Sequence, residues 1–546
     1  MMKSRYSFAL AALMLGLTAG AQDLDTEITV NHEVVPEEHA ATRLRIMPQI
    51  SLPKIDAGRL QPASRYLPAQ LSPYIFPLSP ASWLDRQKRY PYRGYAMLGY
   101  GPLYNLTGSV GYRFVENEQL TVDAYGQFNG MSYTRGYRKL PPFMADYDGK
   151  ACFRRQAAMV GANARWTSSA GTLTGSVMYD YLGYNYPILQ LQVPAVTDKH
   201  VIDANLANVN LGWSAAKGAF DYAVGVDYSM IYLGKNNANN NRVALSGAAN
   251  WRTSSKSAIN LDLGFSLDNS ALANNKGILH ILPRYSFAVN QFKLRLGVDL
   301  DIKTGNVAYG PTMLVAPDVD VVWQPSTFFS IWGKVNGRMD DNYRGKLLEE
   351  QPYLLADFDA GMSRIYNGDA GLTIGPIRGA AIQVFAGYTI AKDWYFPAVT
   401  TGYMDPIDVK GFHWGAAFNY DWRRYLSTNL RLDIAQSPRG DYSKGYAPWR
   451  DHAKLNLVYN LTVRPIDKLD IGVGYHLRAG RQKTLGAGKD LNLCNISNLS
   501  ASVSYKITPQ WSAFVRGENL LNQNWYLGPA VPCQGIMGMV GATYKF

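Results

Sequence analysis

The stretch FKLRLGVDLDIK, residues 292–303, alternates apolar side chains with polar or small ones along its whole length. The apolar set is Phe292, Leu294, Leu296, Val298, Leu300 and Ile302, and the other set is Lys293, Arg295, Gly297, Asp299, Asp301 and Lys303. Because successive side chains of a strand point to opposite faces, this stretch predicts a β-strand with one apolar and one wet face. The same period recurs between Gly94 and Phe546, most clearly in residues 105–114, 426–434, 454–463, 469–477 and 498–507.

The length of these strands and their connections favour a membrane barrel over a soluble sandwich. The predicted strands run to about 9 to 15 residues, whereas strands of soluble proteins average about five or six. Short turns are predicted at 116–117, 168–171, 215–218, 253–256, 290–291, 324–327, 375–379, 422–425, 465–468 and 508–510. Longer loops alternate with them, among them 133–152, 186–202, 337–362 and 394–410. Short turns on one side and long loops on the other predict an all-β, antiparallel transmembrane β-barrel of about 22 strands, with 20 and 24 as alternatives.

The composition excludes several other classes of protein. The chain has 546 residues, 47% of them hydrophobic, which argues against disorder. Three cysteines are too few for a disulfide scaffold, and past residue 21 no apolar run is long enough for a membrane-spanning helix. The net charge of +12 is spread without a basic stripe, so we expect contact with outer-membrane lipid head groups and not with nucleic acid.

The amino terminus predicts export. Lys3 and Arg5 precede a short apolar run, and a small-residue cleavage site ends at Ala21, so residues 1–21 are expected to be a signal peptide removed before Gln22. Residues 22–93 are rich in proline, which disfavours helix, and predict an extended segment in the periplasm or the lumen. Residues 94–546 form the expected barrel, integral to the outer membrane of a Gram-negative bacterium.

The last strand carries a second targeting pattern. Val540, Ala542, Tyr544 and Phe546 alternate up to the final residue. The terminal aromatic pattern, with Tyr544 and Phe546, resembles the signal that the barrel assembly machinery recognises, and implies that machinery as a partner.

The last 36 residues resemble TonB-dependent receptors, with Asn519-Leu520-Leu521-Asn522, then Tyr526, then a closing Gly541-Ala542-Thr543-Tyr544-Lys545-Phe546. With the signal peptide, they look like barrels of the Bacteroidota. The chain departs from the family's Gly-Arg near the final strand, where Gln534-Gly535-Ile536 stands. The resemblance implies a barrel of 22 strands, uptake of solutes and TonB as a partner.

The chain also departs from this family at its front. The family fills its barrel with a plug domain, but only the proline-rich residues 22–93 precede the barrel here. These residues form a reduced plug, or the lumen is partly open, or another protein closes it. The strand-like Glu27, Ile28, Thr29 and Val30 faintly resemble the family's TonB-contacting box.

Few side chains suggest chemistry of their own. His476 and Asp470 fall on one inward face, but a wet face gives such pairs by chance, so we expect neither an enzyme nor a cofactor. Cys494 and Cys533 follow one another in two extracellular loops, and export permits a disulfide between them, which would leave Cys152 unpaired.

Two loop groups have simple interpretations. Asp340, Asp341, Glu349, Glu350, Asp357 and Asp359 match no calcium-loop spacing and are expected to be solvated, so no metal site is predicted. Trp394, Tyr395, Phe396, Trp525 and Tyr526 are interpreted as an aromatic girdle at the membrane interface, with ligand stacking as the alternative.

These patterns indicate a location and an architecture, and leave two functions open. The first is uptake or passage of solutes through a wide polar lumen. The alternative is a structural or assembly scaffold in a complex with other outer-membrane or periplasmic proteins. No residue pattern identifies a ligand.

Overall fold

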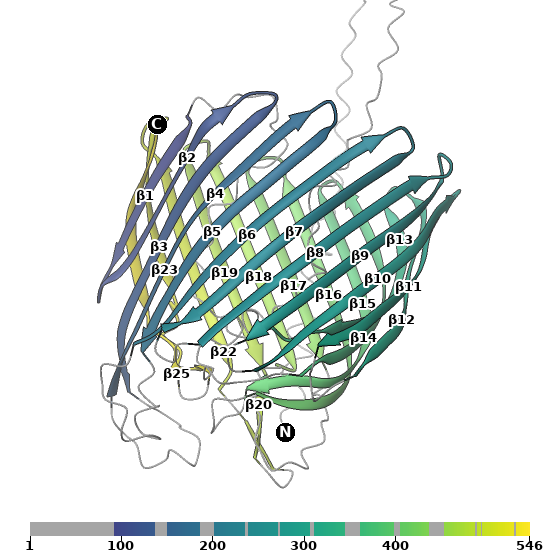
Figure 1. Ribbon diagram of the computed structural model, residues 1–546. Helices are drawn as coiled ribbons and strands as arrows, with labels where there is room; N and C mark the ends of the chain where they lie inside the picture. The colour runs from purple at the N-terminus through teal and green to yellow at the C-terminus, as the bar shows by residue number, and fades with distance from the viewer. Residues whose placement is uncertain are drawn as a thin grey trace, which may run out of the picture. The chain divides into compact units, whose positions relative to one another are not determined.

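The computed structural model describes residues 92–136, 150–185, 201–234, 238–270, 273–305, 311–343, 361–397, 404–435, 453–485, 489–492, 494–528 and 531–546 (Figure 1). The signal peptide, the Ala21–Gln22 cleavage site and the strand-like residues 27–30 lie outside these ranges. The described residues contain no helix that is long and apolar enough to cross a membrane.

The described chain folds into β-strands throughout. In chain order they are β1 (Gly94–Gly101), β2 (Asn105–Glu116), β3 (Leu120–Gly136), β4 (Lys150–Ser168), β5 (Gly171–Asn185), β6 (Val201–Lys217), β7 (Phe220–Leu233), β8 (Ala238–Arg252), β9 (Ser257–Ser270), β10 (Ala273–Val289), β11 (Phe292–Gly305), β12 (Met313–Ser326), β13 (Phe329–Asp340), β14 (Ser363–Ile377), β15 (Ala380–Pro397), β16 (Met404–Trp422), β17 (Leu426–Ala435), β18 (Leu455–Ile466), β19 (Leu469–Ala479), β20 (Gln482–Leu485), β21 (Lys489–Asn492), β22 (Ile496–Lys506), β23 (Trp511–Glu518), β24 (Tyr526–Gly528), β25 (Val531–Pro532) and β26 (Met537–Lys545).

Twenty-two of these strands form one closed antiparallel barrel, which confirms the predicted fold and strand count. Each barrel strand pairs with the next one along the chain, and β1 pairs with both β2 and β26. The pairing of the first strand with the last removes both sheet edges, as hydrocarbon requires. The short strands β20 and β21 pair with each other outside this sheet, as do β24 and β25.

The predicted short turns join the strands at one rim, which also holds the C-terminus (Figure 1). At the opposite rim the strands run further than the sequence suggested. Residues 394–410 were expected to be a loop, but β15 continues to Pro397 and β16 begins at Met404. Transmembrane strands need only about 9 to 11 residues, so strands such as β4 and β16 extend beyond the bilayer. Past the lipid both faces are wet, and the alternation that marks a strand fades.

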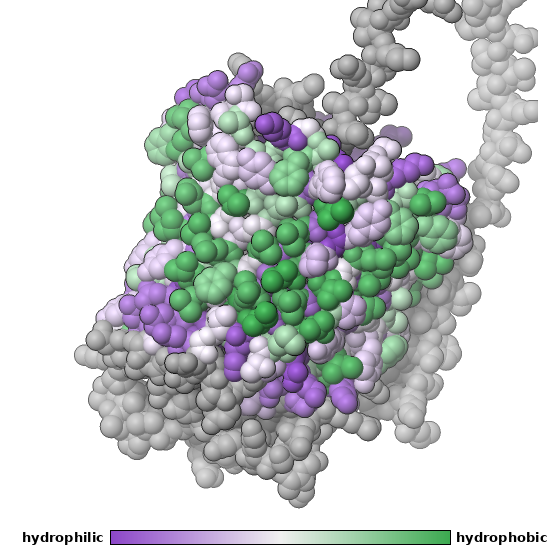
Figure 2. All heavy atoms as spheres, turned by 45° about the vertical axis from the view of Figure 1, so that its right-hand side comes forward, coloured by the Kyte–Doolittle hydropathy of each residue, from purple (hydrophilic) through white to green (hydrophobic). Residues whose placement is uncertain are grey.

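The outer face of the barrel is apolar and the inner face is polar. On β6 and β7, for example, Val209, Leu211, Val224 and Val226 are exposed on the outside, while Asn208 and Asp227 lie on the other face. Figure 2 shows the apolar residues gathered in a band on the outer surface, with polar residues toward its borders. This distribution is that of a barrel with lipid outside and water inside.

Aromatic side chains mark the short-turn rim of this band. Phe292 stacks on Trp323 with ring centroids 6.0 Å apart, and Trp511 lies 4.6 Å from Tyr544. Phe546 stacks on Tyr112 across the junction of the last and first strands. The rings place an interfacial girdle at this rim, where amphipathic aromatics are stabilised at head-group level.

Candidate functional site: the charged inner wall

The inner wall, meaning the side chains that face the lumen, carries paired charges over β9 to β12. Arg284 of β10 forms ion pairs with Asp262 of β9 and with Asp318 of β12, the latter at 3.7 Å. Arg295 of β11 pairs with Asp320 of β12. These groups lie on the polar faces that the alternation predicted. The ion pairs hold charged side chains in place on the wall, on the side that faces the lumen.

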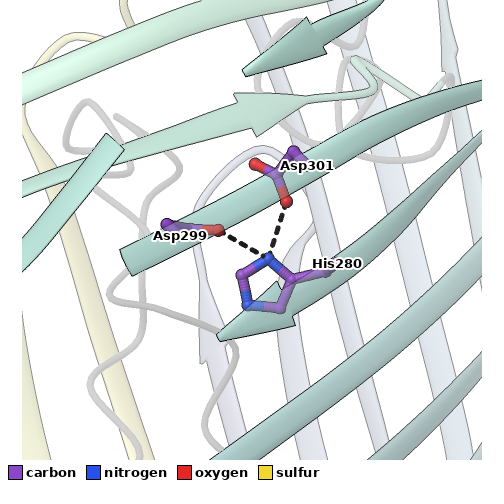
Figure 3. Close-up of side chains that lie close together, drawn as sticks. All are labelled: His280, Asp299 and Asp301. Atoms are coloured by element: carbon purple, nitrogen blue, oxygen red, sulfur yellow. Dashed lines mark hydrogen bonds and ion pairs between the residues drawn. The ribbon is translucent and has the colours of Figure 1, made fainter. Parts of the chain in front are cut away.

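Another group on this wall brings one histidine close to two carboxylates. His280 of β10 faces two carboxylates of β11, and we call these three residues the His280 cluster (Figure 3). Nδ1 of His280 lies 2.6 Å from Oδ1 of Asp301 and 3.0 Å from Oδ1 of Asp299. Register positions the cluster, because His280 is the direct cross-strand partner of Asp301. Asp299 lies two residues away on the same face.

The cluster is buried on its acidic side and open on its imidazole side. Asp301 is 2% exposed and Asp299 6% exposed, whereas the side chain of His280 keeps 32% of its exposure. A buried apolar cluster formed by Ile278, Leu314, Ala316, Met339 and Met362 lies on the same strands and their neighbours. The two carboxylates therefore sit in the wall, and the imidazole is reached from the lumen.

The last residue of β13 and the three residues after it contact the inner wall. In this rim segment, Asp340 to Tyr343, Asp341 pairs with Arg242 of β8 at 2.8 Å, and Arg242 also lies over the ring of Tyr343. Lys276 of β10 donates to the carbonyl oxygen of Asn342 at 3.1 Å. The expectation that the acidic loop is solvated is wrong for Asp341, which is buried because a cation on a distant strand pairs with it. Glu349, Glu350, Asp357 and Asp359 lie outside the described residues.

His476 and Asp470 of β19, whose occurrence on one face was attributed to chance, have different partners in the structure. Nε2 of His476 contacts Oδ1 of Asn456 at 2.8 Å, whereas Asp470 accepts from Arg464 at 2.7 Å. The two side chains therefore hydrogen-bond to different groups on the wall.

Cys494 and Cys533 are free thiols in the structure, and the disulfide between them stays a prediction. Cys533 is buried with Ile496 and Trp525, and its Sγ donates to the carbonyl oxygen of Gln523 at 3.4 Å. Burial raises the pKa of the Cys533 thiol. Cys152 is exposed.

The loop aromatics do not form one girdle. Trp525 is 4% exposed and buried beside Cys533, so it does not face lipid. Trp394 packs against Ile365, Ala391 and Val409. The hydroxyl of Tyr395 accepts the backbone N–H of Gly361 at 2.6 Å, which fixes the chain beyond the rim segment. The side chains of Phe396 and Tyr526 lie outside the described residues.

The C-terminal residues lie where the barrel closes. Tyr544 and Ala542 of β26 pair with Ala96 and Leu98 of β1. Phe546 and Gly94 exchange backbone hydrogen bonds of 2.8 and 3.0 Å. The pattern that resembles an assembly signal is therefore also the pattern that completes the sheet.

The fold and wall together define the class: a closed 22-strand β-barrel with an apolar exterior and a charged interior. No family model matches the chain, and a search of curated proteins finds no match.

Solved structures resemble it in fold. The FrpB iron transporter from Neisseria meningitidis (F5-1 variant) has a TM-score of 0.65 at 12% identity, over 83% of this chain and 82% of that chain. The siderophore receptor PirA from Acinetobacter baumannii has a TM-score of 0.62 at 10% identity, over 83% and 80%. A mutant of the ferric enterobactin receptor PfeA from Pseudomonas aeruginosa gives 0.61 at 9%, over 83% and 80%.

Proposed function

We propose that this protein is an integral outer-membrane β-barrel that takes up or admits solutes, with TonB as its energising partner. The observation that carries the proposal is the closed barrel with fixed charges on its inner wall, such as Arg284 between Asp262 and Asp318. A scaffold needs the apolar exterior but not a wide lumen lined with charge. The fold likeness to an iron transporter and to siderophore receptors supports the same role.

Residues 22–93 are proposed to restrict the lumen, and Glu27 to Val30 to contact TonB. The test is conductance of the purified mature chain in planar lipid bilayers, compared with a chain that lacks residues 22–93. Transport predicts a small current from the mature chain and a several-fold larger one from the shortened chain. A sealed barrel in both cases, together with stable co-purification of other outer-membrane proteins from native membrane, supports the scaffold instead.

The inner wall provides a second, independent readout. Replacing Arg295 by Gln removes one positive charge from the wall beside Asp320 and is expected to shift the reversal potential toward cation preference. Ferric siderophores are the first cargo to test, as suggested by the proteins of similar fold. Uptake in whole cells is expected to fall when residues 27–30 are deleted, if TonB energises it through them. Unchanged uptake in that variant contradicts the TonB contact and leaves the conductance test to decide on the lumen.

A further inference from the structure

Three ligand atoms of the His280 cluster converge on one point of the inner wall. Nδ1 of His280 and one carboxylate oxygen each of Asp299 and Asp301 all lie within 4.8 Å of one another. Figure 3 shows both carboxylates directed at the same ring nitrogen. Metal–ligand bonds of about 2.0–2.2 Å place neighbouring ligand atoms roughly 3 Å apart. The observed 2.6 and 3.0 Å separations match this spacing.

A single proton on His280 does not satisfy this arrangement. The ring nitrogen Nδ1 carries at most one hydrogen, which it directs to one oxygen. Asp301 takes the shorter contact, and Oδ1 of Asp299 lies 3.0 Å from Nδ1 without receiving a hydrogen bond. Leaving a buried carboxylate oxygen without a hydrogen bond is costly. A cation at this point would contact all three atoms at once.

The two carboxylates are held in place for such a cation. Asp301 uses its other oxygen, Oδ2, to accept the backbone N–H of Met339 at 2.6 Å, which turns Oδ1 toward His280. Hydrogen bonds of this kind orient the ligands in metal sites. Asp299 is held by burial. Because the imidazole side is open to the lumen, water can fill the remaining coordination positions.

We propose that His280, Asp299 and Asp301 bind one divalent first-row transition metal ion. One imidazole nitrogen and two carboxylate oxygens form a mixed ligand set that suits Zn²⁺, Mn²⁺, Fe²⁺ or Co²⁺ better than the all-oxygen sets of Ca²⁺ or Mg²⁺. Two carboxylates also match a charge of 2+ when the imidazole is neutral. The site is independent of the proposed transport function, because metal binding to the wall is measured without solute passage.

The test is Zn²⁺ binding by calorimetry and Mn²⁺ binding by electron paramagnetic resonance. It uses the full mature chain in detergent, stripped with chelator and purified without a histidine tag. One ion per barrel is expected. Asp299→Asn and His280→Gln are each expected to weaken binding at least about tenfold, which corresponds to about 1.4 kcal/mol.

His413→Gln is the matched control. His413 is also on the inner wall and contacts a single carboxylate, that of Asp369, at 2.7 Å. This variant is expected to bind the metal as the wild type does. Heat-modifiable mobility in gels verifies that each variant barrel is folded. Equal binding in all four proteins, or binding lost only in the His413 variant, overturns the proposal.

A spectroscopic measurement on the wild type avoids dependence on variants. Co²⁺ is expected to give visible absorption bands, and X-ray absorption of the Zn²⁺ form to report one imidazole with otherwise oxygen ligands. Absence of saturable binding at millimolar metal contradicts the proposal, as does a ligand shell with no imidazole.

Discussion

Asp301 of β11 accepts the backbone N–H of Met339 of β13, although β12 lies between these two strands. The paired register of β12 and β13 ends at Val319 and Val335, beyond which β12 contains Pro317. Met339 thus lies in a part of β13 that has no ladder partner on β12. The carboxylate of Asp301 accepts the N–H of Met339, which has no acceptor on β12. Asp301 therefore contacts both the backbone of β13 and the imidazole of His280.

Asp301→Ala is expected to destabilise the barrel by about 1–3 kcal/mol, because it leaves the buried N–H of Met339 without an acceptor. Asp301→Asn keeps an acceptor oxygen and is expected to lose less. Urea titration of the folded barrel, followed by tryptophan fluorescence, measures the difference. Asp470→Ala is the control, because that carboxylate pairs with Arg464 in a partly solvated setting. Equal losses for the three variants contradict this role of Asp301.

Val209 and Asn208 are neighbours on β6 and face lipid and lumen respectively. Val209 is 42% exposed on the apolar exterior, midway along its strand. Val209→Arg is expected to cost about 2–4 kcal/mol, because it places a charge in hydrocarbon. Asn208→Arg adds the same side chain on the wet face and is expected to change stability by less than about 0.5 kcal/mol. Folded fraction in liposomes against urea distinguishes the two, and an inverted order would mean that the assignment of faces is wrong.

Gly541 and Gly538 of β26 differ in the space around them. A Cβ at Gly541 would press into the carbonyl oxygen of Leu98 on β1 and the ring of Phe514 on β23. A Cβ at Gly538 meets nothing within 4 Å. Gly541→Ala is therefore expected to destabilise closure by about 1–3 kcal/mol through overpacking, and Gly538→Ala to be nearly neutral. The yield of heat-modifiable barrel during refolding measures the effect, and matching yields would contradict it.

Cys152 and Cys533 are expected to react at different rates. Cys152 is exposed and should be alkylated by iodoacetamide first. Burial raises the pKa of Cys533, so its thiolate fraction at pH 8 is smaller and its alkylation slower. Raising the pH toward that pKa should accelerate Cys533 more than Cys152. Mass spectrometry of labelled peptides gives the rates, and faster labelling of Cys533 would refute the burial argument.

The same labelling tests the predicted disulfide. If Cys494 and Cys533 are joined after export, only Cys152 is labelled in protein taken from native membrane without reductant. Reduction should then expose two further thiols. Three labelled cysteines before reduction would mean that the two thiols stay separate, as they are in the structure.

The barrel is predictable from the sequence because each strand and turn is determined by residues close together in the chain. The alternation seen in residues 292–303 is imposed by lipid on one side and water on the other. A two-residue turn at Asn290 and Gln291 also fixes the register of β10 against β11. His280 and Asp301 are equally far from this turn, so the turn position alone predicts that they pair across the two strands.

Other parts of the site depend on contacts that no local pattern encodes. The hydrogen bond between Asp301 and Met339 exists because the ladder of β12 and β13 stops early. The burial of Asp341 depends on Arg242, which lies on β8, five strands away from β13. Such contacts are set by how the chain folds back into the lumen, and charge patterns in the sequence predict only a solvated loop.

The hydrogen bonds between Gly94 and Phe546 also mean that the barrel cannot close until β26 is in place. The first barrel strand, β1, is synthesised long before its partner, β26. Until β26 is in place, β1 presents an open edge that can pair with any other strand. The closing step has the largest sequence separation in the sheet, so it is slow. Assembly of this barrel therefore requires that the edge of β1 stays shielded throughout that interval and is released only to β26.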